Sequence, residues 1–223
     1  MKKQNLTKLD PITLEIQWKR LVSMVDEASA AFVRTSFSVL VREANDFAVV
    51  LTDAQGRSIA QSVLSIPSFI GTLPATVKHF LQKFPAKTLK PGDVMITNDP
   101  WMGTGHIHDV NTAMPIFHKG KIVAYAAVVS HMPDIGGRIR NAGIRDIYEE
   151  GLQIPRMKLI SAGKPDQNLL DMIGQNVRVP EQTLGDIWAQ VAACKMLEER
   201  LKPLLSEIEM PSRNTWARLA DRR

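Results

Sequence analysis

Apolar residues recur at helical spacing in two long segments, one near each end of the chain. The first begins at Asp10-Pro11, an acid and a proline that favour a helix start, and continues to about Val39. The second begins at Pro180. The apolar positions are Leu14, Trp18, Leu21, Val25 and Phe32 in the first segment, and Leu184, Ile187, Trp188, Val191, Cys194 and Leu201 in the second. Each segment therefore predicts a long helix with one buried face.

Between these segments the pattern changes to short runs of strand-forming residues separated by turns. FAVVLT at 47–52 and SIAQS at 58–62 flank the turn DAQG and predict a β-hairpin. VNTAMPIF at 110–117 and IVAYAAVVSH at 122–131 flank the turn HKGK and predict a second one. The last of these runs is apolar throughout, which is typical of a strand buried on both faces.

A shorter helix at 71–84 and a short strand at 94–98 complete the expected elements. Helices at the two ends of the chain and hairpins between them indicate the α+β (mixed α/β) class. We expect antiparallel hairpins in a mixed sheet, packed with the long N- and C-terminal helices.

Composition narrows the class of protein. With 223 residues, 44% of them hydrophobic, the chain can bury a substantial core. Its net charge is +5, but the basic residues are dispersed until the last stretch, so we expect no nucleic-acid partner. The single cysteine, Cys194, cannot form an internal disulfide and lies on an apolar helix face, where it packs. No signal peptide or membrane-length apolar run is present, which favours a cytoplasmic protein without membrane contact.

The stretch NDPWMGTGHIHDV at 98–110 places two of the chain's five histidines next to Asp109. If the second hairpin turns on Lys119-Gly120, the numbers of paired residues sum to about 239, so His131 faces His108 and Asp109 faces Ser130. His106 then lies just beyond, at the same end of the sheet. Imidazole and carboxylate groups gathered in this way suit a catalytic divalent metal.

Strand geometry complicates this interpretation. On a regular strand His106 and His108 share a face, whereas Asp109 points to the other face. Only a bulge or irregular backbone would let His106 and Asp109 bind the same ion. The alternative is a hydrogen-bonded loop without metal. His118 falls in the hairpin turn, so we exclude it as a ligand.

Four motifs resemble the hydantoinase B/oxoprolinase family, in that family's order and spacing. The resemblance covers about residues 10–205. The family includes the B subunit of N-methylhydantoinase, the C-terminal part of 5-oxoprolinase, and the large subunits of acetone and acetophenone carboxylases. The motifs are NDPWMGTGHIHDV, SHMPDIGG at 130–137, IYEEGLQIPRMKL at 147–159 and NVRVPEQTLGDIWAQVAA at 176–193.

The resemblance implies a metal site and a partner. Family members work with an A-type subunit that binds ATP and phosphorylates the substrate, while the B component hydrolyses or carboxylates the activated molecule. A divalent metal (Mn, Zn or Fe) is implied at His106, Asp109 and His131, with irregular backbone around 103–105 and His108 as a weaker extra ligand. The absence of a GxxxxGK[ST] motif agrees with ATP being handled by the partner.

Four further residues are site candidates. Asp99 and Asp134 could orient the ligands or move protons, and the alternative for both is loop capping. Arg138 and Arg140 could hold a carboxylate or phosphate of the activated substrate, and the alternative for both is a solvated loop position.

The resemblance implies the N-terminal part of a family domain at 1–208, followed by a divergent basic tail at 209–223. We expect a hetero-oligomer acting on a small molecule, as the metal-dependent B-type component of an ATP-dependent cyclic amide or imide hydrolase. The alternatives are a subunit of a ketone carboxylase and a non-catalytic metal-binding or assembly fragment. The sequence does not choose among hydantoin, 5-oxoproline and ketone substrates.

Overall fold

The structure is a computed structural model that describes residues 11–138 and 143–207. Its elements, in chain order, are α1 (Pro11–Thr35), α2 (Val39–Arg42), β1 (Phe47–Asp53), β2 (Ser58–Gln61), α3 (Pro67–Lys83), a 3-10 turn at Ala86–Thr88, β3 (Val94–Thr97), β4 (Asp109–His118), β5 (Lys121–His131), β6 (Met157–Ser161), β7 (Lys164–Pro165), α4 (Gln167–Asn176) and α5 (Pro180–Glu207).

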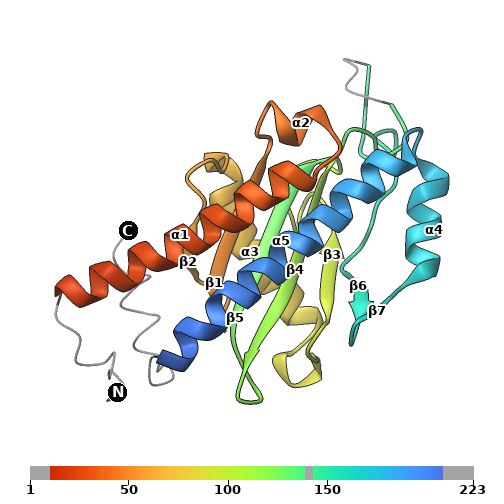
Figure 1. Cartoon of the computed structure of the whole chain (residues 1–223). Coiled ribbons are helices and arrows are strands. Elements are labelled where there is room, and N and C mark those ends of the chain that lie inside the picture. Colours follow the sequence, from red (N-terminus) through yellow and green to blue (C-terminus); the bar gives the residue numbers. More distant parts are fainter. Residues whose placement is uncertain (1–10, 139–142, 208–223) are drawn as a thin grey trace.

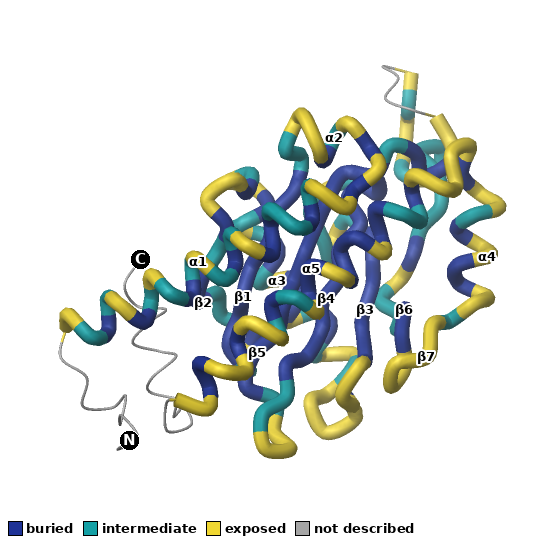
Figure 2. The backbone as a smooth tube through the Cα atoms, viewed as in Figure 1, coloured by how far each residue is buried: buried dark blue, intermediate teal, exposed yellow. Residues whose placement is uncertain are grey.

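The described elements form three layers around one sheet (Figure 1). α1 and α5 lie side by side on one face, and α3 covers the other. Successive side chains of β1 point to opposite faces of the sheet. Phe47, Val49 and Leu51 pack on the face covered by α1 and α5. The alternate residues Ala48 and Val50 pack with α3. Figure 2 shows the buried strands between more exposed helices.

The sheet has the strand order β2-β1-β5-β4-β3-β6-β7. The α+β class and both predicted hairpins are confirmed. Every recorded pairing is antiparallel, so among the described residues the sheet is antiparallel and not mixed. β5 lies between β1 and β4 and is buried from Val123 to His131, as its continuous apolar run predicts.

The predicted register of the β4–β5 hairpin is wrong by one residue at the end away from the turn, where Asp109 and His131 lie. Next to the turn, Phe117 pairs with Ile122, and the two numbers sum to 239 as expected. Beyond it Ile116 pairs with Ala124, so Val123 is an extra residue in β5 and the hairpin contains a β-bulge. The shift carries through the strand and places His131 opposite Asp109 instead of His108.

Two helix boundaries also differ from the predictions. α1 ends at Thr35 and not near Val39, because the following amides of Phe37 and Ser38 donate to the Asp186 carboxylate at 2.6 and 3.3 Å instead of continuing the helix. α3 begins four residues early, at Pro67, where the missing N–H of a first-turn proline costs nothing. The expected cap at Asp10 and the tail at 209–223 lie outside the described residues.

The C-terminal helix is confirmed as α5, and Cys194 is fully buried in it. α4 was not predicted, although Asp166 caps it by accepting a hydrogen bond from Leu169 N at 3.1 Å. Among the described helices, none combines the length and apolar character needed to cross a membrane.

Candidate metal centre

The loop between β3 and β4 is held in place by Asn98, a buried residue directly after β3. Its amide donates to the Ile107 carbonyl at 2.7 Å and to the Leu152 carbonyl at 2.9 Å, while its oxygen accepts from Ile154 N at 2.6 Å. One side chain therefore joins the end of the loop to a segment more than fifty positions later. The sequence analysis missed this residue because its partners are distant in the chain.

Asp99 starts the turn of that loop. Its carboxylate accepts from Trp101 N at 2.9 Å, and its carbonyl accepts from Met102 N at 3.1 Å. Gly103 follows, where a Cβ would lie 3.0 Å from the Asp99 carbonyl oxygen and 2.8 Å from the Asn111 amide. These are the contacts of the loop-capping alternative for Asp99.

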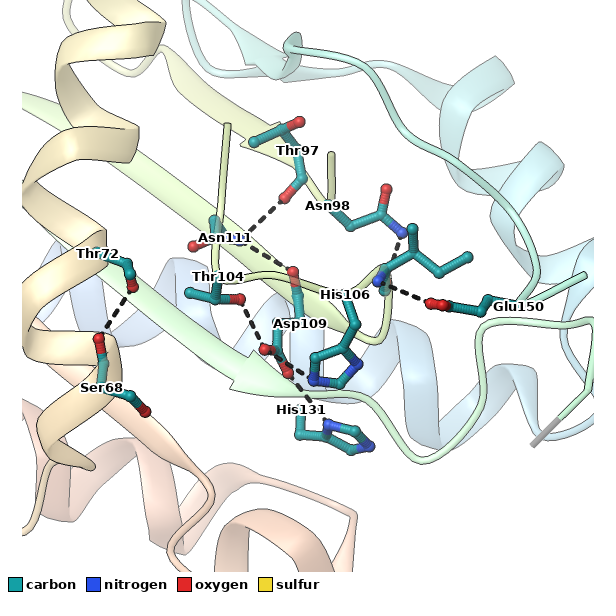
Figure 3. Close-up of polar contacts among 11 residues, drawn as sticks. Ser68, Thr72, Thr97, Asn98, Thr104, His106, Asp109, Asn111, His131 and Glu150 are labelled. Atoms are coloured by element: carbon teal, nitrogen blue, oxygen red, sulfur yellow. Dashed lines mark hydrogen bonds and ion pairs between the residues drawn. The ribbon is translucent and has the colours of Figure 1, made fainter. Parts of the chain in front are cut away.

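Asp109, the first residue of β4, lies between two imidazoles (Figure 3). Its Oδ2 is 3.0 Å from His106 Nε2, and its Oδ1 is 3.1 Å from His131 Nδ1. Thr104 donates its hydroxyl to Oδ2 at 2.6 Å. The Asp109 side chain is fully buried, His131 is nearly so, and His106 is 34% exposed. Of these three side chains, His106 is therefore the most exposed to solvent.

Irregular backbone brings His106 and Asp109 together, as the sequence analysis required. β4 begins only at Asp109, so strand alternation does not apply to residues 106–108. A turn precedes it, with Gly105 at a φ of 110° and a long contact from Asp109 N to the His106 carbonyl at 3.4 Å. The turn and the register shift of the hairpin together place two imidazoles on opposite oxygens of one carboxylate.

The electrostatics of Asp109 follow from these contacts. Burial raises the pKa of the carboxyl, but hydrogen bonds from His106, His131 and Thr104 outweigh burial and lower the pKa to about 2. Asp109 is therefore ionised at neutral pH. A buried carboxylate anion bordered by two imidazoles attracts a cation.

The ligand atoms of His106, Asp109 and His131 lie within 4.8 Å of one another, as one ion requires. Two imidazoles and one carboxylate form a donor set that suits Zn, Mn or Fe and leaves coordination positions for water or substrate. The residues present therefore fit the metal that the family resemblance implies.

The fourth predicted ligand, His108, is 4% exposed and lies beside this set. Its ring stacks on that of His131, with 5.3 Å between centroids and 7° between planes. It belongs to a second close group, formed with His106 and Glu150. Glu150 was missed by the sequence analysis because it enters from a distant turn.

Gln190 of α5 supports the two strands behind the centre. Its amide donates to the Val110 carbonyl at 3.0 Å and to the Ser130 hydroxyl at 2.8 Å. Val110 and Ser130 are paired, and each adjoins one of the proposed ligands. The helix thus holds the strands in the register that sets Asp109 opposite His131.

Asp134 forms its hydrogen bonds with Gly136 and Arg178 and not with the proposed metal ligands. Its carboxylate accepts hydrogen bonds from Gly136 N at 2.9 Å, from the Arg178 guanidinium at 2.8 Å and from Arg178 N. Burial raises the pKa of Asp134, but the Arg178 and Gly136 contacts lower it overall. Asp134 is not part of either close group of ligand atoms, and its contacts are those of a structural carboxylate.

The two candidate arginines lie on the glycine-rich loop. Arg138 is exposed, and its guanidinium is 3.4 Å from the Glu149 carboxylate. Arg140 lies outside the described residues. The functional roles expected of Asp99, Asp134, Arg138 and Arg140 stay predictions.

Comparison with known proteins identifies the relatives of this chain. Residues 10–218 match the sequence profile of hydantoinase B/oxoprolinase. The chain belongs to this family. It is 32% identical over 200 residues to the caprolactamase β subunit of Pseudomonas jessenii and 30% identical over 190 residues to 5-oxoprolinase of Dictyostelium discoideum. These matches cover 88% and 84% of this chain, but only 34% and 15% of the relatives.

The fold is also shared with solved structures of two ATP-dependent enzymes. The structure of the P. jessenii caprolactamase superposes with a TM-score of 0.84 at 29% identity, over 95% of this chain and 37% of the other. Nucleotide-free acetone carboxylase superposes with a TM-score of 0.82 at 21% identity, over 96% of this chain and 29% of the other. The chain thus spans about a third of the length of these proteins.

Proposed function

We propose that this chain is the metal-binding catalytic component, the B-type subunit, of an ATP-dependent hydrolase of cyclic amides or imides, such as a hydantoinase or 5-oxoprolinase. The observation that carries the proposal is the buried Asp109 carboxylate, with His106 on one oxygen and His131 on the other. Membership of the hydantoinase B/oxoprolinase family gives that metal centre its chemical context.

His106, Asp109 and His131 would hold the ion. When bound, a divalent cation polarises a carbonyl or lowers the pKa of a water molecule towards ~7. Thr104 donates its hydroxyl to Asp109 Oδ2 and so orients the carboxylate. The side chains of Asp109 and His131 are buried whereas His106 is partly exposed, so the His106 side offers a route for a small substrate.

The energy-coupling step belongs to a partner in this proposal. The chain has no GxxxxGK[ST] motif, and its relatives include a subunit named caprolactamase β. We assign ATP binding and substrate phosphorylation to an A-type subunit, and hydrolysis of the activated ring to this chain within a cytoplasmic hetero-oligomer. Arg138 is proposed to bind the anionic group of the activated substrate, because its guanidinium is exposed on the glycine-rich loop.

Reconstitution tests the function. The chain is combined with an A-type partner, ATP, a divalent metal and either hydantoin or 5-oxoproline, and both ADP and ring-opened product are measured. We expect the two products to appear together. We also expect Asp109→Asn to abolish ring opening and Glu199→Gln, a control at an exposed position of α5, to leave it unchanged.

Two other outcomes would replace the proposal. Ketone consumption that depends on ATP and bicarbonate, without ring opening, would assign the chain to a carboxylase of the acetone or acetophenone type. A stable complex that turns over neither substrate class would favour a non-catalytic metal-binding or assembly subunit.

A further inference from the structure

A second set of metal-binding side chains adjoins the first. The ligand atoms of His106, His108 and Glu150 also lie within 4.8 Å of one another. We propose that these three residues form a second divalent-cation position that shares His106 with the position at Asp109 and His131. This inference concerns cation binding alone and does not depend on the substrate or on the partner.

Backbone packing determines where Glu150 lies. The diglycine at 136–137 presses directly on the backbone at 149–151, and a Cβ on Gly137 would lie 2.5 Å from the Glu149 carbonyl oxygen. Hydrogen bonds lock the two segments, from Arg138 N to the Glu149 carbonyl at 2.9 Å and from Leu152 N to the Ile135 carbonyl at 2.8 Å. The turn that carries Glu150 is therefore held against the loop after β5.

The Glu150 side chain points at the backbone between the two histidines (Figure 3). Ile107 N approaches its Oε2 at 3.4 Å, and Ile107 separates His106 from His108 in the chain. Asn98 fixes the same place from behind, since it binds the carbonyls of both Ile107 and Leu152. The segment that carries His106 and His108 and the segment that carries Glu150 are thus both hydrogen-bonded to the buried Asn98 amide.

The three imidazoles form a compact group. Their ring centroids are separated by 5.5 Å for His106–His108, 5.0 Å for His106–His131 and 5.3 Å for His108–His131. To hold both cations at once, His106 would bind one through each ring nitrogen and would have to release its ring N–H proton. With only one of the two positions filled, it would bind through a single nitrogen and keep that proton. Two imidazoles and a carboxylate repeat the donor set of the first position, and they suit the same divalent cations.

The charges also permit a second cation. Asp109 and Glu150 bring two carboxylates to the group, one on each side of His106. Their negative charge offsets the repulsion between two nearby divalent cations, which neutral imidazoles alone would not do.

Manganese titration of the purified full chain, followed by electron paramagnetic resonance of free Mn²⁺, tests the proposal without ATP or substrate. Asp109→Asn/His131→Ala removes two ligands of the first position and none of the second. We expect this variant to retain about one equivalent of Mn²⁺. Adding Glu150→Gln should raise the Kd at least about tenfold, because a direct ligand is lost. Adding the neighbouring Glu149→Gln should leave the Kd unchanged.

The proposal is overturned if the folded double variant binds no Mn²⁺, or if Glu150→Gln and Glu149→Gln affect binding equally. Circular dichroism checks folding, and His131→Ala alone serves as the background, with the same comparison and criteria, if the double variant does not fold. Failure of reconstituted turnover with this Mn²⁺ result intact would count against the proposed function only.

Discussion

Asp93 and Asp109 are two buried acids at the starts of neighbouring strands, and they contact different kinds of side chain. Asp93, just before β3, accepts from Lys158 Nζ at 2.7 Å, from Lys90 N at 2.9 Å and from Ala162 N at 2.7 Å. Asp109, which begins β4, faces His106 and His131. In both, burial raises the pKa of the carboxyl but hydrogen bonds lower it by more, so each is ionised at neutral pH.

The difference lies in the partners. Lys158 forms an ion pair with Asp93, so that carboxylate ties the start of β3 to β6. An imidazole can present a ring-nitrogen lone pair to a metal, which a lysine ammonium cannot do. A buried acid with a lowered pKa therefore does not by itself mark a functional site. Asp134 resembles Asp93, because Arg178 satisfies it in the same way.

The largest expected effect is on metal affinity. Asp109→Asn keeps the volume of the side chain but removes its charge, so we expect the first Mn²⁺ position to weaken at least about hundredfold. Asp93→Asn, the matched change, should leave the Mn²⁺ affinity unchanged. Mn²⁺ titration of both variants measures this, and equal losses in the two would mean that the partner distinction is wrong.

Asp93→Asn should instead reduce stability. It leaves Lys158 partly buried without its carboxylate, and we expect the free energy of unfolding to fall by about 2–3 kcal/mol at pH 7. Urea denaturation of the two proteins gives this difference.

The stability that the Asp93 carboxylate contributes should depend on pH. The pKa of Asp93 is lowered below 3.8, so its contribution is fully present above that unfolded value and is lost as the pH falls through the folded pKa. The gap between wild type and Asp93→Asn should be constant from pH 7 to about 5 and should shrink below about 3.8. A gap that closes between pH 7 and 5 would contradict the assignment to Asp93.

Glycine substitutions test how the second cation position is held. Gly137 has a φ of 57° and no space for a Cβ, so Gly137→Ala should lower the free energy of unfolding by at least about 2 kcal/mol. Gly163 has a φ of 83° but open space around it, and Gly163→Ala should cost about 1 kcal/mol. Thermal or urea denaturation compares the two. Similar costs would show that the 149–151 segment does not press on Gly137.

The smallest effect is expected at Arg138. Its ion pair with Glu149 is exposed, so Arg138→Ala should change the free energy of unfolding by less than about 0.5 kcal/mol. In the reconstituted enzyme the same variant should raise KM, if the guanidinium binds the activated substrate as proposed. An unchanged KM would remove Arg138 from the site.

Local patterns were sufficient for much of this protein. Helical periodicity gave α5 and most of α1, and turn residues gave both hairpins, because these features depend on neighbours in the chain. The residues His106, Asp109 and His131 were also predicted, since the family resemblance supplied their combination. Their proximity confirms the geometry, whereas their role as metal ligands stays a prediction.

Tertiary structure decided how those residues meet. Val123 creates a bulge that no periodicity signals, and this one residue moves His131 from His108 to Asp109. Asn98, Gln190 and Glu150 take their places through contacts 9 to 80 positions away. The sequence thus determined which side chains were available and which segments were helix or strand. Packing between distant segments chose the register and the partners, because those depend on contacts that local pattern does not contain.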